Sequence, residues 1–174
     1  MSACSKSIIE CLKLSGISPT ATSKTQYGSF DPQYAIDYNS NSYFNSNSDG
    51  GSQWWMVDFK KEVAIGGYSI SVNAKSCDWI KKWKVSVSIN KDLWTTVDTP
   101  PEGHPNGEYR ELKKSCIAKY LKIESLDNVC GYVMAFKNIY FYPPSIKQMM
   151  VYCTCRNKRK IDFSFPKIIV LFLS

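Results

Sequence analysis

The alternation of apolar and polar residues over short segments constrains the fold of this chain most strongly. Between residues 83 and 89 every odd-numbered residue is apolar and every even-numbered residue is Lys or Ser. Because successive side chains of a strand point to opposite faces, this pattern predicts a half-buried strand of an antiparallel sheet. Further β-type runs occur at residues 54–59, 67–72, 119–123 and 135–142, separated by turn signals. Runs at this spacing predict an all-β sandwich from about residue 16 to residue 142.

Two long polar segments connect these runs. Residues 39–52 are rich in Asn, Ser, Asp and Gly, and residues 98–107 contain three prolines and two glycines. Such residues satisfy their own backbone in surface loops, where the binding sites of sandwich domains usually lie. Pro143 and Pro144 end the last run. We therefore expect an extension over residues 1–13, one domain over 14–143, and a basic and apolar tail over 144–174 that is either poorly ordered or packed on the domain.

The charge of the chain lies mostly in its tail. The formal net charge is +7, but residues 145–174 hold six basic residues and one acidic residue, which leaves 16 basic and 14 acidic residues in 1–144. A nucleic-acid-binding domain carries its basic patch on the fold itself, so we expect no nucleic-acid partner. The apolar run 168–173 is far shorter than the roughly 20 residues of a membrane span.

The cysteines and the N-terminal residues indicate the cellular compartment in which the protein is expected. There are seven cysteines, so at least one is unpaired within the chain, and residues 1–11 lack the apolar core of a secretory signal. A reducing compartment with free thiols is the simpler interpretation, which slightly favours a cytoplasmic location. The pair Cys153 and Cys155 is spaced too closely for a usual zinc knuckle. The basic run 156–160 is interpreted as a solvated tail, with a localisation or binding signal as the alternative.

A search for catalytic groups finds none. The chain has a single His, and it lacks G-x-S-x-G and Walker patterns. We therefore expect no enzymatic activity, although carboxylates that are paired only in space are invisible in one sequence.

Several segments resemble one family in order and at its spacing. Residues 34–44 resemble the signature Ala-Phe-Asp-Gly-Asn-x-x-Thr-x-Trp of the discoidin, or coagulation factor 5/8 type C, domain. Residues 53–59 look like its Trp-hydrophobic-x-Val-Asp-Leu strand, residues 79–94 like its lysine and aromatic strand with the following turn, and residues 118–123 like its Ala-Arg-Tyr strand. Residues 135–142 resemble its closing strand.

The resemblance implies a jelly-roll β-sandwich of the galactose-binding-like superfamily. Such domains bind glycans, anionic lipids or proteins through loops at one end, take part in cell adhesion in some cases, and are usually not catalytic. It also implies that a disulfide between Cys11 and Cys130 is conceivable, as such sandwiches are often closed by terminal cysteines. The sequence does not choose among these ligands, the cysteine pairings or the oligomeric states.

The resemblance implies one possible cofactor, a structural Ca²⁺. In many family members a tight turn holds Ca²⁺ through a carboxylate, backbone carbonyls and a hydroxyl, with support from a Glu on the last strand. The matching residues here are Ala35, Asp37, Asn39, Ser42 and Asn138. Asn138 offers only a neutral carbonyl where the family has Glu, so the alternative is an Asx turn without metal.

The candidate ligand-binding residues lie in the loops. His104 and Arg110 are of the types that related domains use to bind galactose-like sugars, and Trp79 beside Lys81 and Lys82 suits a sugar ring or a lipid interface. The 45–49 segment supplies further hydrogen-bonding groups, namely Asn45, Asn47 and Asp49. The alternatives are a solvated His104 and a Trp79 that only caps the sandwich. We expect Phe44, Trp54, Trp83 and Trp94 in the core.

Three functions remain open from the sequence. The first is a binding module for carbohydrate or another surface ligand, including an anionic membrane. The second is an intracellular protein–protein interaction domain, which the free cysteines favour. The third is a hydrolase on the same scaffold, for which no catalytic pair is found.

Overall fold

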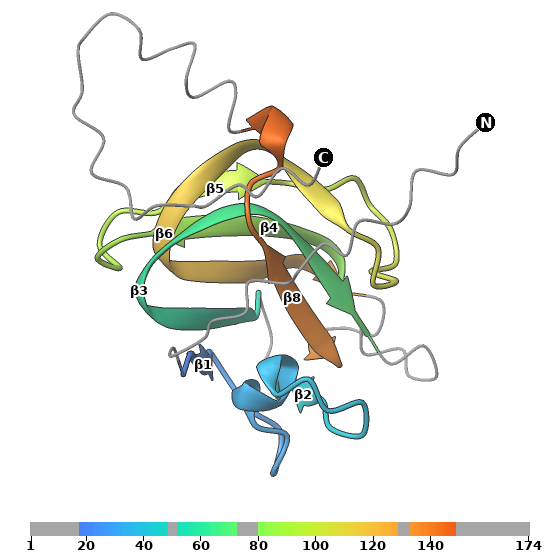
Figure 1. The fold of residues 1–174 in the computed structure, drawn as a ribbon. Coiled ribbons are helices and arrows are strands. Elements are labelled where there is room, and N and C mark those ends of the chain that lie inside the picture. The colour runs from blue at the N-terminus through green and yellow to red at the C-terminus, as the bar shows by residue number, and fades with distance from the viewer. Residues whose placement is uncertain (1–17, 49–51, 73–79, 129–132, 149–174) are drawn as a thin grey trace, which may run out of the picture.

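Short strands and two very long ones make up the described part of the chain. The computed structural model describes residues 18–48, 52–72, 80–128 and 133–148 (Figure 1). The elements are β1 (Thr20–Ser23), the 3₁₀ helix η1 (Pro32–Ile36), β2 (Phe44–Asn45), β3 (Trp54–Ser71), β4 (Ile80–Ser88), β5 (Thr95–Asp98), β6 (Arg110–Asn128), β7 (Ala135–Phe136) and β8 (Asn138–Tyr142).

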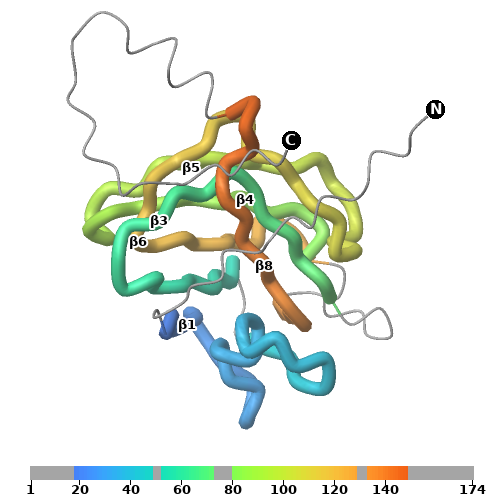
Figure 2. The backbone as a smooth tube through the Cα atoms, viewed as in Figure 1, coloured from blue at the N-terminus to red at the C-terminus, as the bar shows by residue number. Residues whose placement is uncertain are grey.

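The strands form two layers, and the long strands β3 and β6 run through the centre of both. Their pairing is antiparallel and has two parts, residues 54–58 with 120–124 and residues 63–68 with 110–118. Strands β1, β4 and β5 extend the first part in the order β1-β3-β6-β4-β5, and β8 pairs with the second half of β3. Figure 2 shows both long strands curving around one end of the molecule. The expected antiparallel all-β sandwich is therefore confirmed.

A bulge in β3 produces this curvature. The register shifts between Asp58 and Val63, where residues 59–62 of β3 lie opposite the single residue Lys119 of β6. Lys60 adopts a left-handed backbone with φ of 65°, and its amide donates to Asp58 Oδ1 at 2.7 Å. Bulges bend the strand that contains them, so the chain turns here from one layer into the other.

The layers enclose an aromatic core. Trp55 is fully buried, its ring meets Phe136 edge-on at 6.2 Å, and its Nε1 donates to the Pro32 carbonyl at 2.9 Å. Phe44 and Trp83 are buried as expected. The expectation for Trp54 and Trp94 is wrong, because both are only partly buried. Trp55, one position later, takes the inward face, since adjacent strand residues point to opposite sides.

The predicted runs correspond to strands with different limits. The runs at 54–59 and 67–72 belong to the one strand β3, and the final run is divided into β7 and β8. Ile89, expected on the inward face, lies beyond the end of β4 and is exposed. Phe44 and Asn45 form a strand inside the polar segment 39–52, because they pair with β7. The short strand β1 has no alternation that predicts it.

Residues 143–148 pack back onto the sandwich. The buried Gln148 side chain donates from Nε2 to the carbonyls of Gly66 at 2.9 Å and Leu112 at 2.7 Å. A Cβ atom at Gly66 would collide with Pro144 and Gln148. This close approach therefore requires glycine at position 66.

Gln148→Ala tests this packing. The substitution leaves the Gly66 and Leu112 carbonyls without a donor in a buried place, which costs about 1–3 kcal/mol of unfolding free energy. Urea unfolding followed by tryptophan fluorescence measures the change. Gln26→Ala is the control, because Gln26 is exposed and its side chain donates to the carbonyl of the nearby Gly28. Equal unfolding free energies for the two variants would contradict the role of Gln148.

Candidate functional site

Basic and acidic side chains meet at the end of the sandwich where β4 and β6 begin. Lys81 and Lys82 of β4 both contact the Glu102 carboxylate, at 2.5 and 2.9 Å. Hydrogen bonds from these two lysines lower the pKa of the Glu102 carboxyl, and the same contact raises the pKa of Lys81. The Gly103 amide donates to the Lys81 carbonyl at 3.1 Å, so the loop 99–109 is tied to β4.

Arg110, the first residue of β6, is anchored through a chain of hydrogen bonds that enters the core. Its Nε donates to Asp98 Oδ2 at 3.3 Å, and the Tyr68 hydroxyl donates to the same oxygen at 2.7 Å. The Trp83 indole in turn donates to the Tyr68 oxygen at 3.3 Å. Burial, and then the hydrogen bond to Asp98, raise the pKa of Tyr68 well above its ordinary value, so its hydroxyl remains a donor.

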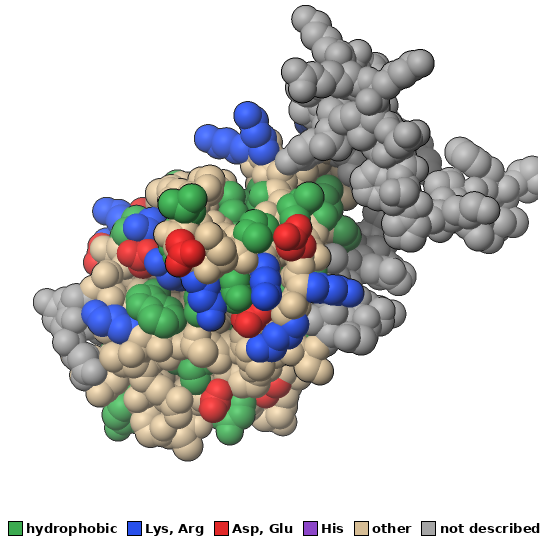
Figure 3. Space-filling model, turned by 90° about the vertical axis from the view of Figure 1, so that its left-hand side faces the viewer, with side chains coloured by type: hydrophobic (Ala, Val, Ile, Leu, Met, Phe, Trp, Pro, Cys, Tyr) green, Lys and Arg blue, Asp and Glu red, His purple; other side chains and the backbone are tan. Residues whose placement is uncertain are grey.

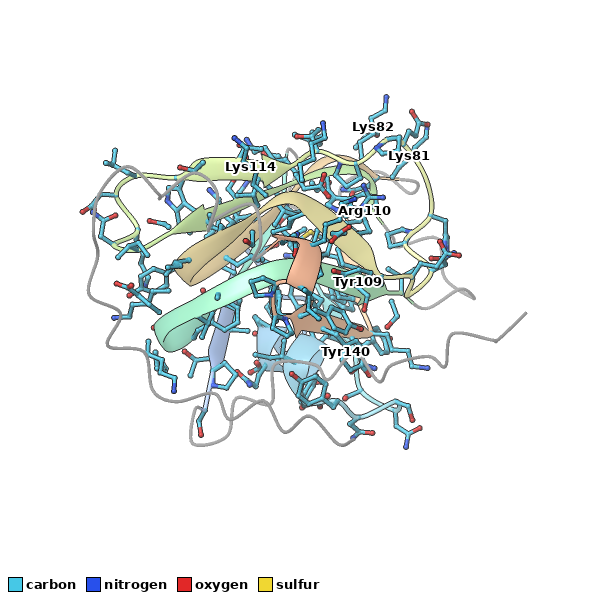
Figure 4. The ribbon with its side chains drawn as sticks, turned by 45° about the horizontal axis from the view of Figure 1, so that its top comes forward. Lys81, Lys82, Tyr109, Arg110, Lys114 and Tyr140 are labelled. Atoms are coloured by element: carbon cyan, nitrogen blue, oxygen red, sulfur yellow. The ribbon has the colours of Figure 1, made fainter. Side chains whose placement is uncertain are left out.

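Tyrosine rings pack in pairs along β8 and at the residue before Arg110. Tyr109 meets Tyr142 edge-on with centroids 5.0 Å apart, and a Cβ atom at Gly67 would collide with the Tyr109 ring. Further along β8, Tyr140 stacks with Tyr38 at 5.3 Å. Figure 4 shows Lys81, Lys82, Arg110, Tyr109 and Tyr140 following one another down one side of the molecule. In this view the cations of β4 and β6 lie above the two labelled tyrosines.

The turn at residues 37–42 is closed by its own polar groups. Asp37 Oδ1 accepts from the Asn39 amide at 2.9 Å and Asp37 Oδ2 accepts from the Ser42 hydroxyl at 2.6 Å. A surface hollow of about 310 Å³ adjoins this turn; its lining residues are Ser29, Phe30, Tyr34, Asp37, Asn39, Asn41, Ser42 and Tyr43. Asn138 is buried, and its Oδ1 has no hydrogen-bond partner among the described residues. Ala35 is buried in η1.

The structure brings together some of the predicted ligand-binding residues. Lys81, Lys82 and Arg110 lie at the same end, and the exposed His104 lies in the loop that contacts Lys81. Asn45 is buried. The backbone amide of Asn47 donates to Thr25 Oγ1 at 3.1 Å and so closes the adjacent loop. The buried side chain of Asn45 is therefore not presented to a ligand. Asp49 and Trp79 lie outside the described residues, as do the cysteines except Cys116.

Sequence reasoning missed Glu102, Asp98 and the tyrosines. Glu102 contacts residues some twenty positions away, and Asp98 meets Tyr68 only through the folding of β3 over β5. The alternation Tyr140, Phe141, Tyr142 in the last predicted strand was the one available signal, since it places two tyrosines on the outward face.

Two general findings concern the described residues. No group of three or more His, Cys, Asp or Glu side chains gathers there as a metal site would require. No helix in that part of the chain has the length and apolar character to cross a membrane.

The antiparallel β-sandwich agrees with the comparison of the chain with known protein families. The family model for the F5/8 type C domain matches residues 19–137, and the chain belongs to this family. No curated protein matches the chain in sequence.

Solved structures show the same fold. The chain is similar to CpGH89CBM32-5 from Clostridium perfringens, a structure in complex with GalNAc-β-1,3-galactose (16% identity, TM-score 0.63, covering 71% of this chain and 94% of that one). It is also similar to the family 32 carbohydrate-binding module of NanJ from the same organism, in complex with galactose (21%, 0.63, 71% and 93%). A third is chitosan-binding module 1 of a Paenibacillus chitosanase/glucanase (20%, 0.63, 71% and 93%). The expected galactose-binding-like fold is therefore confirmed.

Tyr68→Phe tests the chain of hydrogen bonds behind Arg110. Without the hydroxyl, the buried Trp83 indole loses its acceptor and Asp98 loses a donor, which costs about 1–3 kcal/mol of unfolding free energy. Chemical denaturation measures this loss. Tyr27→Phe is the matched control because Tyr27 is largely exposed. A Tyr68→Phe variant as stable as this control would show that these hydrogen bonds contribute nothing to the stability of the fold.

Proposed function

We propose that this domain is a non-enzymatic carbohydrate-binding module whose ligand contacts Arg110, Tyr109 and the Lys81, Lys82 and Glu102 group. The observation that carries the proposal is the Arg110 guanidinium, anchored by Asp98 at the end of the sandwich that also holds Lys81, Lys82 and Glu102. Nε is held by Asp98, and no other partner of the guanidinium occurs among the described residues. The planar head group is thus oriented in advance, which lowers the entropy lost on binding.

The chemistry of this surface suits a sugar. A guanidinium donates two parallel hydrogen bonds, which match neighbouring hydroxyls of a pyranose ring. An aromatic ring such as that of Tyr109 packs against the apolar face formed by the C–H groups of a sugar. The ammonium groups of Lys81 and Lys82 donate, and the Glu102 carboxylate accepts, so both hydrogen-bonding roles of a hydroxyl have partners. The structural neighbours in complex with galactose and GalNAc-β-1,3-galactose support this ligand class.

The carboxylates at this end support a binding role and not hydrolysis. A glycosidase needs one carboxylic acid with a raised pKa to protonate the leaving group. Glu102 contacts two lysines, which lower the pKa of its carboxyl, and Asp98 is paired with Arg110. Glu102 is therefore not suited to act as a general acid, and the Asp98 carboxylate is occupied by its ion pair with Arg110.

Arg110→Gln tests the proposal. It removes a charged donor pair, and we expect the affinity for bound glycans to fall about tenfold or more, the usual cost of a hydrogen bond from a charged group. A glycan array identifies the ligands, and calorimetry with the strongest of them gives the affinities. Lys113→Gln is the control, since it removes the same charge from an exposed position of β6.

Two results would contradict the proposal. One is a folded wild-type domain that binds no glycan on the array. The other is a glycan that Arg110→Gln binds as tightly as Lys113→Gln does. Circular dichroism of each variant confirms that the sandwich is intact.

We also propose that the 37–42 turn binds Ca²⁺ weakly. The Tyr38–Tyr140 stack holds this turn against β8, the strand that carries Asn138. All the matching groups offer oxygen, which Ca²⁺ prefers, and a cation would satisfy the orphaned Asn138 Oδ1. Asp37 is the one carboxylate in this set, and a single carboxylate gives low affinity.

Thermal unfolding in millimolar CaCl₂ and in EDTA tests the metal proposal. A cation that binds only the folded state raises the Tm, so we expect a higher Tm with Ca²⁺. Asp37→Asn is expected to abolish the difference, and Asp92→Asn, which changes a carboxylate in the turn after β4, is expected to retain it. An identical wild-type Tm in both buffers would exclude the site.

A further inference from the structure

The pairing of β6 with β3 is interrupted next to Arg110. Glu111 of β6 pairs with Gly67 of β3, but the regular pairing resumes only at Cys116. Residues 112–115 of β6 therefore lie opposite a single residue of β3 and form a second bulge. A bulge disrupts the ladder locally, so contacts other than the ladder must fix where the first residues of β6 lie.

The side-chain amide of Gln148 joins the two strands at this interruption. Its Nε2 donates to the Gly66 carbonyl of β3 at 2.9 Å and to the Leu112 carbonyl of β6 at 2.7 Å, which uses both of its hydrogens. Its Oε1 accepts from the Ser145 amide at 2.9 Å. Gln148 is only 7% exposed, so water does not compete for these bonds. A side chain from outside the sheet thus links the two central strands where their own pairing is irregular.

The segment that carries Gln148 also contacts the residue on each side of Arg110. Ser145 Oγ donates to Glu111 Oε1 at 2.8 Å and accepts from the Gln148 amide at 3.3 Å. On the other side, the Tyr109 ring meets the last residue of β8 edge-on. Figures 1 and 2 show the turn after β8, in orange, against the first half of β6. This turn therefore holds the backbone around Arg110 from outside the sheet.

We propose that Ser145 and Gln148 are positioning residues for Arg110. They fix where β6 resumes its pairing with β3, and therefore the point from which the Arg110 side chain extends. Asp98 then orients the guanidinium through Nε. The inference rests on the proposed binding role of Arg110, and it makes the affinity of that site depend on a turn that contacts no ligand.

The position of this turn in the chain gives the inference a consequence. Gln148 is the last residue of the turn, and the chain continues beyond it to residue 174. A change in the following segment that withdraws the Gln148 amide releases the start of β6, and so lowers the affinity of the site without touching it.

The Nε–H signal of Arg110 tests the positioning role without any ligand. The chain holds three arginines, so few Nε–H signals occur in a ¹⁵N correlation spectrum, and Arg110→Gln identifies the one that matters. In the wild type this hydrogen is donated to Asp98, so we expect it to exchange slowly with solvent. Ser145→Ala and Gln148→Ala are expected to shift the signal and to accelerate its exchange.

Glycan affinity gives the functional measurement. Calorimetry with the glycan that binds most strongly on the array is expected to show binding weaker by about twofold to thirtyfold in Gln148→Ala, the range for residues that act through their neighbours. Ser145→Ala is expected at the lower end of this range, and Ser145→Thr, which keeps the hydroxyl, is expected to bind as the wild type does. In an Arg110→Gln background, Gln148→Ala is expected to add less than about twofold, because its effect passes through Arg110.

Ser88→Ala is the matched control for a loss of stability. Ser88 is buried at the opposite end of β4 from Lys81, and its hydroxyl accepts from the Lys91 amide at 2.9 Å. The turn that follows it lies on the side of the molecule that Figure 3 shows, where charged and hydrophobic side chains are interspersed. We expect Ser88→Ala to lower the Tm and to leave both the Arg110 signal and the glycan affinity unchanged.

Three outcomes would overturn the inference. They are an Arg110 signal in Ser145→Ala and Gln148→Ala that matches the wild type, a Ser88→Ala variant that changes the signal as much, and unchanged affinity in both variants for a glycan whose binding Arg110→Gln weakens. A wild-type domain that binds no glycan contradicts only the proposed function, because the Arg110 signal still tests the positioning. Circular dichroism shows whether each variant is folded, and Ser145→Ala, which leaves the Gly66 and Leu112 bonds in place, carries the test if Gln148→Ala does not fold.

Discussion

The bend of β3 against β6 is the constraint on which the rest of the structure depends. Residues 59–62 of β3 form a bulge opposite a single residue of β6. Because the strands bend there, one pair of long strands supplies the central strands of both layers. The first part of the pair receives β1, β4 and β5, and the second part receives β8. Trp55 and Tyr68, on the two sides of the bend, thereby come to line the same core.

This arrangement connects the core to the surface at the end where β6 begins. Tyr68 lies on the second part of β3, and Asp98 and Trp83 belong to β5 and β4 in the other layer. The hydrogen bonds among them therefore cross from one layer to the other and end on Arg110. A functional side chain that is supported from the interior keeps its orientation without ligand, which is the requirement for preorganised binding.

Local pattern predicted the fold better than it predicted the site. The alternation at 83–89 identified most of β4 because a half-buried strand has a period of two, and it placed Trp83 correctly. At residues 54–59 the pattern did not show which of the adjacent Trp54 and Trp55 faces the core, since in a run of apolar residues either one can face inward. Lys81, Lys82 and Arg110 were selected as loop cations, but their partners Glu102 and Asp98 depend on pairing between distant segments. Asn45 was misjudged as a surface group because two residues are too short to show a strand.

Gly67 makes the surface near Arg110 sensitive to a position that no ligand touches. The Tyr109 ring occupies the space in which a side chain at position 67 would stand. A Cβ atom there would also lie 2.6 Å from the Arg110 carbonyl oxygen, so a larger residue must displace both the ring and the backbone at the start of β6. A side chain at position 67 would therefore shift the backbone that carries Arg110 without itself touching a ligand, so the orientation of the guanidinium depends on the absence of a side chain one strand away.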